Sequence, residues 1–171
     1  MPVDPRTLTL LLHPNDMLRQ KADSVDPSDS EVHAVARRLM ELMVQHEGAG
    51  LAAPQVGLSW RIFVTRDPEN SDNAIAWINP ALEIVTPELI TEEEGCLSLP
   101  HVLGNVCRPV GIKITGWNVD GEPSQMTSED HLARVWQHEY DHLEGILIID
   151  KMSAMDRLVN RRAIRTLELS V

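Results

Sequence analysis

The chain has 171 residues and a net charge of −11, and 43% of its residues are hydrophobic. This length is typical of a single domain, and the negative charge disfavours a general DNA-binding or RNA-binding surface, which needs a basic field. No apolar run approaches the roughly 20 residues of a membrane-spanning helix. The N-terminal residues resemble neither a secretory signal nor a transit peptide. We therefore expect one cytoplasmic domain over residues 1–171, with no membrane partner.

The first predicted helix begins near Ser28, which forms a capping box with Glu31 three residues later. Apolar residues then recur at helical spacing, and Gly48 is the expected stop. The spacing predicts an amphipathic helix with one buried face. The residues expected on that face are Val32, Val35, Ala36, Leu39, Leu42 and Met43.

The middle of the chain predicts short β-strands at residues 61–65, 74–79, 82–85 and 112–117. These segments are rich in β-branched, aliphatic and aromatic residues, and dipeptides with Pro or Gly separate them. Their close spacing favours antiparallel pairing, because a parallel crossover needs about a dozen residues or more.

A second predicted helix begins near Thr127 and ends at Gly145. The short apolar segment 146–149 then predicts a buried strand, and Ser153 marks the start of a last helix. The expected fold class is α+β, with short antiparallel strands forming sheets around the second helix. An N-terminal and a C-terminal helix flank this central helix.

The segment 138–142, His-Glu-Tyr-Asp-His, carries the strongest chemical pattern. On a helix, His138 and His142 lie on one face one turn apart, so both imidazoles can bind one metal ion. Glu139 lies beside that face and can reach a metal-bound water without becoming a ligand. Two ordinary helix histidines beside an exposed Glu also fit this loose pattern.

Two histidines leave a metal site incomplete, so the third ligand decides the class of enzyme. In the metzincin proteases a third His follows the helix, but here Ile148 occupies that position. Other zincins use a downstream Glu, and Glu168 lies almost at the chain end. Cys96 is a better candidate, because one Cys and two His would leave a fourth position open to water. Taken alone, the stretch around Cys96 favours a buried structural cysteine.

Residues 48–55 form a third unusual segment, in which small residues and Pro predominate. So few large side chains suggest a backbone that approaches a ligand or another element closely. Gln55, at the end, is the one polar side chain of the segment. Tight packing beneath a sheet, with Gln55 capping a loop, is the favoured interpretation of this segment by itself.

The stretches GAGLAAPQ (48–55), EGCLS (94–98) and QHEYDHLEG (137–145) together resemble the three motifs of the peptide deformylases. The family patterns are G-x-G-x-A-A-x-Q, E-G-C-x-S and H-E-x-D-H, and every specified position matches. The order, the spacing and the chain length also fit, so the resemblance covers nearly the whole chain.

The resemblance implies one divalent metal ion per chain, bound by Cys96, His138 and His142. Bacterial members of the family hold Fe(II) natively, and Zn, Ni or Co can replace it. We therefore expect Fe(II) as the native ion.

The resemblance further implies removal of the N-formyl group from the formyl-methionine of newly synthesised polypeptides, which releases formate. Glu139 would be the general base and acid for the attacking water, and Gln55 with the backbone N–H of Leu97 would bind the oxyanion. The residues expected along the substrate are Gly48, Ala49, Gly50 and Gly95, with Val135 in the wall of the methionine pocket.

The C-terminal segment is basic, and in bacterial members of the family a C-terminal extension docks on the ribosome. The resemblance extends this role to the last helix, whose basic residues are Arg157, Arg161, Arg162 and Arg165. By itself the basic segment favours a solvated helix face. Cys107 takes the place of a Pro found in many relatives, and we interpret it as a structural thiol.

Two other functions remain open at this point. A zincin-type metalloendopeptidase would use the same helix but lacks a third ligand downstream. A non-catalytic relative that binds formylated or other peptides would need neither Glu139 nor Gln55. A disulfide between Cys96 and Cys107 is not expected in a chain of this size without a secretion signal.

Overall fold

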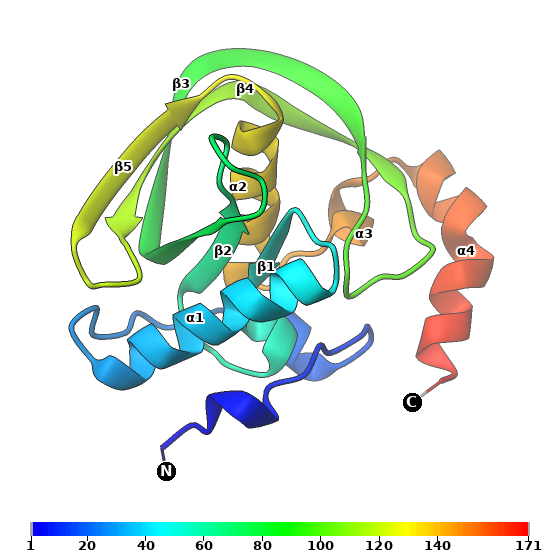
Figure 1. Ribbon diagram of the computed structural model, residues 1–171. Helices are drawn as coiled ribbons and strands as arrows, with labels where there is room; N and C mark the ends of the chain where they lie inside the picture. The colour runs from blue at the N-terminus through cyan, green and yellow to red at the C-terminus, as the bar shows by residue number, and fades with distance from the viewer. Residues whose placement is uncertain (1, 171) are drawn as a thin grey trace.

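The computed structural model describes residues 2–170, which form one five-stranded sheet with helices packed around it (Figure 1). The predicted α+β class is confirmed. The strands are β1 (Gly50–Ala52), β2 (Ile62–Arg66), β3 (Ala74–Glu94), β4 (Gly104–Trp117) and β5 (Pro123–Ser128). The α-helices are α1 (Ser30–Gln45), α2 (His131–Leu143), α3 (Ile148–Lys151) and α4 (Ala154–Glu168). Short 3-10 helices lie at η1 (Pro5–Thr7), η2 (Asp16–Arg19) and η3 (Ala53–Val56).

The five strands pair in chain order, and every pair is antiparallel, as the sequence predicts. Figure 1 shows β3 and β4 as a long ribbon that arches over α2. The helix also contacts β1 and β2, so the curved sheet surrounds it on several sides. The predicted central helix is therefore the element around which the fold is built.

The prediction of separate strands at 74–79 and 82–85 was wrong, because both segments belong to the single long strand β3. The pairing of β3 with β4 shifts register at three places, between Ile84 and Thr86 and on passing Pro80 and Pro87. Proline cannot donate to the sheet, but a bulge lets pairing resume beyond it and bends the strand. These prolines therefore curve β3 instead of ending it.

The helix α1 buries all six apolar residues that its spacing predicts, and it packs against β1, β2 and β3. Its predicted start was early, because Asp29 and not Ser28 is the N-cap. The Asp29 carboxylate accepts a hydrogen bond from the Glu31 N–H at 2.8 Å. The Ser28 hydroxyl instead donates to the Asp26 carboxylate at 2.7 Å, in the turn before the helix.

The predicted start of the second helix near Thr127 was also wrong. Thr127 pairs with Lys113 in the antiparallel ladder of β4 and β5, and the helix begins at His131. Asp130 is the N-cap, and its side chain accepts a hydrogen bond from the backbone N–H of N2 at 2.9 Å. The strand β5 ends at Ser128, just before α2 begins, so the polar residues of the strand and of the helix cap are neighbours in the sequence. The capping pattern alone does not show which of them begins the helix.

The interior of α2 packs against the sheet through Trp136, which is fully buried. Its ring lies edge-on to that of Trp77 on β3, with the ring centroids 6.0 Å apart. Aromatic pairs of this geometry contribute about 0.5–1.5 kcal/mol beyond their buried area. The helix ends before Gly145, as predicted, and the φ of +71° at Gly145 suits a glycine. The position of α2 is thus fixed at its centre and at its C-terminus.

The predicted strand at 146–149 was wrong, because the chain turns into the short helix α3 there. Ile148 and Ile149 are buried, as an apolar segment should be. The backbone curls because the Asp150 carboxylate accepts a hydrogen bond from the Leu147 N–H at 2.8 Å. A local side-chain contact thus decides between two structures that hydrophobicity alone does not separate.

The helix α4 begins where predicted, with Ser153 as its N-cap. Figure 1 shows it at the margin of the molecule, beside the turn between β3 and β4. Among its described residues only Asn160 is buried. Within residues 2–170, no helix combines the length and the apolar character that crossing a membrane requires.

Candidate metal centre

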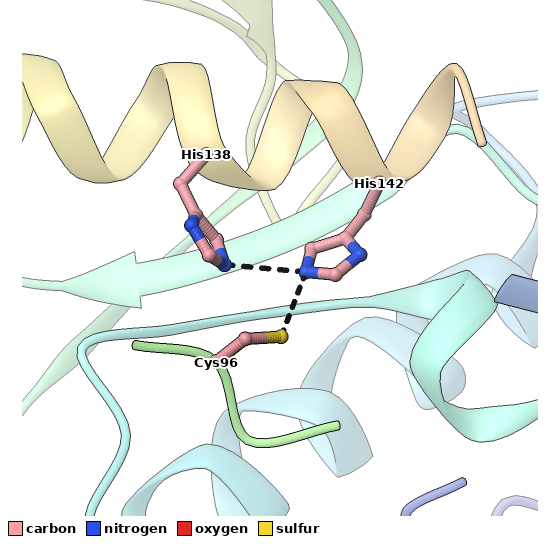
Figure 2. A group of neighbouring side chains, drawn as sticks. All are labelled: Cys96, His138 and His142. Atoms are coloured by element: carbon pink, nitrogen blue, oxygen red, sulfur yellow. Dashed lines mark hydrogen bonds between the residues drawn. The ribbon is translucent and has the colours of Figure 1, made fainter. Parts of the chain in front are cut away.

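Three potential ligands from two elements meet in one cluster. Cys96 lies in the loop after β3, and His138 and His142 lie on α2. Figure 2 shows both imidazoles projecting from the same side of α2 toward the Cys96 sulfur. His142 Nε2 lies 3.4 Å from Cys96 Sγ and 3.3 Å from His138 Nε2. The fold therefore brings together the three residues that the motifs single out.

The spacing of these atoms fits a tetrahedral metal ion. With bonds of about 2.0–2.1 Å to nitrogen and 2.3 Å to sulfur, a tetrahedron separates two nitrogens by about 3.3 Å and nitrogen from sulfur by about 3.6 Å. The observed separations of 3.3 and 3.4 Å are close to these values. A thiolate and two imidazoles also form a donor set that suits Zn and Fe(II). Cys96, His138 and His142 would hold a divalent ion with three protein ligands.

The two imidazoles have opposite pKa shifts. Burial lowers the pKa of His138, but its hydrogen bonds with Cys96 and Glu94 outweigh burial and raise the pKa well above its usual value, so an ion bound there would displace a proton. Burial lowers the pKa of His142 well below its usual value, and the nearby His138 and Arg108 lower it further, so this ring stays neutral. His138 Nδ1 lies 3.1 Å from Glu94 Oε2, which leaves Nε2 to face the cluster. A carboxylate on the far side of a ligating histidine fixes the orientation of its ring.

Glu94 is the centre of a buried ionic network that the sequence did not reveal. Its carboxylate accepts hydrogen bonds from Arg108 at 2.6 and 2.9 Å and from Arg134 at 2.8 Å. Burial raises the pKa of Glu94, but the hydrogen bonds with Arg108 and His138 outweigh it and hold the pKa far below the usual value. Glu94 is thus an anion that orients His138. In the sequence, Arg134 could have indicated a buried acidic partner, because it is a charged residue on the buried face of α2.

Glu139 lies on α2 beside the cluster, with 3% of its surface exposed. Its Oε2 is buried and has no hydrogen-bond partner among the described residues. Burial raises the pKa of Glu139 to about 7, although the nearby His138 lowers it. A carboxyl group with a pKa near neutrality can both accept and return a proton at physiological pH.

The amide of Gln55 is buried and fixed in orientation. Its Oε1 accepts a hydrogen bond from the Ala52 N–H at 2.8 Å, and its Nε2 donates to Ser98 Oγ at 3.1 Å. The same Nε2 lies 3.7 Å from Cys96 Sγ, so one amide hydrogen can point toward the cluster. Ser98, which the sequence did not assign a role, orients this donor.

A cavity of about 370 Å³ lies beside the cluster, which is a volume typical of small-ligand sites. It is lined by ten of the eleven residues that the sequence assigned to the site, and the eleventh, His142, is buried in the cluster with Cys96 and His138. These ten are Gly48, Ala49, Gly50, Gln55, Gly95, Cys96, Leu97, Val135, His138 and Glu139. The cavity also touches Glu93, Glu94, His131 and Arg134, to which the sequence assigned no role.

The residues that a zincin protease would need lie elsewhere. Ile148 is buried in the core around α3, and its side chain has no donor atom. Glu168 lies at the end of α4, where its Oε1 is 3.6 Å from His13 Nε2. Among residues 2–170, the cluster of possible ligands contains no carboxylate.

The interpretation of Cys107 as a structural thiol was wrong, because its side chain is exposed. Alternation along β4 buries Val106 and Arg108 and turns Cys107 toward solvent. Both cysteines are free, as expected.

The fold and the site together indicate a class of protein. An α+β domain with a Cys-His-His cluster, a buried carboxyl group and an oriented amide in one cavity has the parts of a metal-dependent hydrolase.

Comparison with known proteins identifies the family. The family model described as polypeptide deformylase matches residues 7–158. A peptide deformylase of Thermotoga petrophila is 39% identical over 155 residues, which cover 91% of this chain and 93% of that protein. One of Acidobacterium capsulatum is 40% identical over 162 residues, covering 93% and 94%. This chain belongs to the polypeptide deformylase family, a family of hydrolases.

Solved structures agree with this assignment. The crystal structure of a plant peptide deformylase superposes with a TM-score of 0.88 at 32% identity, covering 96% of this chain and 90% of that chain. The structure of a peptide deformylase from Plasmodium falciparum gives a TM-score of 0.87 at 31% identity, covering 95% and 96%.

Proposed function

We propose that this protein removes the N-formyl group from the formyl-methionine of newly synthesised polypeptides and releases formate. The observation that carries the proposal is the meeting, in one cavity, of a Cys-His-His cluster, a buried carboxyl group and a fixed amide donor. Relatives named peptide deformylase, at 39% and 40% identity, support the choice of substrate.

Cys96, His138 and His142 would hold one divalent ion, with Fe(II) as the native metal and Zn, Ni or Co as replacements. When bound, such an ion supplies Lewis acidity and brings the pKa of water toward about 7. Metal analysis of protein purified without oxygen tests the assignment, and loss of activity in air would support Fe(II). Protein that contains only Zn and stays active in air would contradict it.

The ligand set has a matched pair of variants. Cys96→Ala should lower the metal content strongly, because it removes the sulfur atom of the cluster. Cys107→Ala should leave the metal content unchanged, because this second cysteine is exposed on β4. Equal metal content in the two variants would reject Cys96 as a ligand.

Glu139 would move the protons of the reaction. Its Oε2 has no partner among the described residues, so it can accept a proton from the attacking water. The pKa of about 7 then lets the same group return the proton to the leaving amine. A catalytic Glu139 must both accept and return a proton, whereas a Glu139 that only packs against its neighbours does neither.

Gln55 Nε2 and the backbone N–H of Leu97 would stabilise the oxyanion that develops on the formyl group. Both residues line the cavity, and the hydrogen bonds of Gln55 to Ala52 and Ser98 orient its amide in advance. Removing one such donor from an oxyanion site typically costs about 2.7–4 kcal/mol in the activation barrier.

The substrate backbone would lie extended along residues 48–50 and Gly95, where small residues let it approach. Val135 also lines the cavity, and its side chain would contact the methionine side chain. A peptide held in this way presents its N-terminal formyl group to the cluster.

A turnover assay separates this function from its rivals. The metal-loaded enzyme should release formate from formyl-Met-Ala-Ser and leave the internal bonds of an unformylated peptide intact. A metalloendopeptidase would cleave internal bonds, and a non-catalytic relative would bind the formylated peptide without turnover. Either of these two results would reject the proposal.

The enzyme would meet its substrates at the ribosome in the cytoplasm, with α4 as the docking element. Arg157, Arg161 and Arg165 line an open groove of about 440 Å³ on α4, and Arg162 is exposed beside them. A basic face of this kind suits an anionic RNA partner.

Charge reversal on α4 tests this docking. Changing Arg161, Arg162 and Arg165 to Glu should abolish co-sedimentation with ribosomes and leave turnover of formyl-Met-Ala-Ser unchanged. Unchanged co-sedimentation would reject α4 as the docking element.

A further inference from the structure

The backbone conformation at Gly50 does not explain why a glycine occupies this position. Gly50 begins β1 and pairs with Thr65 of β2 in a regular antiparallel register. Its φ lies outside the left-handed region, so residues with side chains can adopt the same backbone geometry. The restriction at this position must therefore come from the space around the α-carbon.

A methyl group on Gly50 would overlap with Glu139. The added carbon would lie 2.5 Å from Oε1, 2.7 Å from Cγ and 2.8 Å from Cδ of that side chain. These distances are far shorter than the roughly 3.5–4.0 Å of normal contact between carbon atoms. All three nearest atoms belong to Glu139, so the space left by the missing side chain is the space that Glu139 fills.

Gly48, two residues earlier, has different surroundings. A methyl group there would approach Leu97 Cδ1 at 2.8 Å and the backbone oxygen of Gly50 at 3.2 Å. No atom of Glu139 is among its three nearest neighbours. The two glycines of the same segment therefore make room for different groups.

Packing against Gly50 contributes to placing the Glu139 carboxyl group. The side chain is buried, yet its Oε2 has no hydrogen-bond partner among the described residues. Gln55 and His138, by contrast, are each held by a polar neighbour. Contact with the α-carbon side of Gly50 thus limits where the carboxyl group of Glu139 can lie.

We propose that Gly50 is a positioning residue, whose missing side chain leaves the space that holds the Glu139 carboxyl group in place for proton transfer. This role presupposes the deformylase function and adds to it, because it assigns Gly50 a task toward the catalytic base as well as toward the substrate backbone. A methyl group would displace the carboxyl group, and a misplacement of about 1 Å can lower a rate by about 10²-fold.

The first test is the division of the effect between kcat and KM. Gly50→Ala should lower kcat on formyl-Met-Ala-Ser by about 10–100-fold and change KM by less than about 3-fold, with full metal content. A raised KM with unchanged kcat would assign Gly50 to substrate binding alone and overturn the inference. If the wild-type enzyme does not turn over this peptide, the deformylase function itself fails, which is a separate result.

The second test measures stability and does not depend on turnover. Thermal unfolding of the metal-loaded protein should show that Gly50→Ala lowers Tm in the wild-type background. In a Glu139→Ala background the same change should lower Tm much less, because the methyl group then has room; contacting residues show such non-additivity. Equal losses of Tm in the two backgrounds would overturn the inference.

Gly48→Ala is the matched control for this cycle. Its methyl group meets Leu97 and not Glu139, so its effect on Tm should be the same in both backgrounds. If Gly50→Ala alone folds poorly, recovery of folding in Gly50→Ala/Glu139→Ala supports the inference, and failure to recover overturns it.

Discussion

The helices α2 and α4 have similar lengths, 13 and 15 residues, but opposite surroundings. Seven residues of α2 are buried, and three of these, Arg134, Glu139 and His142, are polar or charged. On α4 the only buried residue among those described is Asn160, and its arginines face solvent. Figure 1 shows the same contrast, with α2 at the centre and α4 at the margin.

This contrast shows that a polar residue is more informative about function when it is buried, as on α2, than when it is exposed, as on α4. A buried polar group is unfavourable unless it is paired, so each polar side chain inside α2 requires a partner or a chemical task. Arg134 has Glu94 as its partner, while Oε2 of Glu139 has none among the described residues. On α4 a charged residue is solvated and needs no such explanation. Substitutions on α2 should therefore affect chemistry, and those on α4 should affect only docking or local stability.

The largest expected effect is the loss of a ligand from α2. His142→Ala should remove most of the bound metal and nearly all turnover, because the cluster keeps only two ligand atoms. The expected loss of metal affinity exceeds the roughly 10–100-fold that is typical of removing an outer partner of a ligand. Metal analysis after gel filtration measures it. Arg161→Ala on α4 is the control and should keep its metal; a His142→Ala variant with full metal content would break the contrast.

The next effect separates metal binding from catalysis within α2. Glu139→Ala should keep the metal, because Glu139 is not in the cluster of ligands, but kcat should fall by about 10²–10⁴-fold as proton transfer is lost. Steady-state kinetics on formyl-Met-Ala-Ser, together with metal analysis of the same sample, measures both quantities. Substantial residual turnover in this variant would exclude Glu139 as the base.

Removal of the network behind His138 comes third. Glu94→Ala leaves Arg108 and Arg134 buried without their shared partner, which should cost about 3–5 kcal/mol of unfolding free energy. Metal affinity should also fall by about 10–100-fold, because His138 loses its orienting carboxylate. Denaturant unfolding and metal titration measure the two effects. Glu94→Gln keeps the shape and should have a smaller effect on both; wild-type stability in Glu94→Ala would refute the network.

The parts of the fold that the sequence predicted depend on short-range patterns. The buried face of α1 and the start of α4 at Ser153 follow from helical spacing and capping within a few residues. The missed parts depend on distant partners. The strand β5 forms because β4 is available to pair with it, and β3 continues past Pro87 because a register shift permits it. Neither partner can be read from the local sequence.

The candidate site divides in the same way. The three motifs identified the potential ligands, because each motif is a short run of residues that can be recognised in the sequence without knowing the fold. The network of Glu94, Arg108 and Arg134 was missed because its members come from β3, β4 and α2 and form no short pattern. The fit of Gly50 against Glu139 was missed for a similar reason, since it depends on the distance between two elements.

The smallest expected effects lie on α4 and test the other half of the contrast. Asn160 joins this helix to the backbone of Leu103, donating to its oxygen at 2.6 Å and accepting from its N–H at 3.2 Å. Asn160→Ala leaves these backbone groups without that partner and should cost about 1–3 kcal/mol of unfolding free energy. Turnover of formyl-Met-Ala-Ser should stay unchanged, because no residue of α4 lines the cavity beside the cluster.

Leu158→Gln is the matched change on the exposed side of α4, since Leu158 is 60% exposed. It should alter the unfolding free energy by less than about 0.5 kcal/mol, as is usual for surface substitutions. Denaturant unfolding compares the two variants directly. A lower kcat in Asn160→Ala, with an unchanged kcat in Leu158→Gln, would show that α4 is coupled to the site. The coupling would run through the turn between β3 and β4, which also carries Cys96. The separation between the central and the marginal helix would then be incomplete.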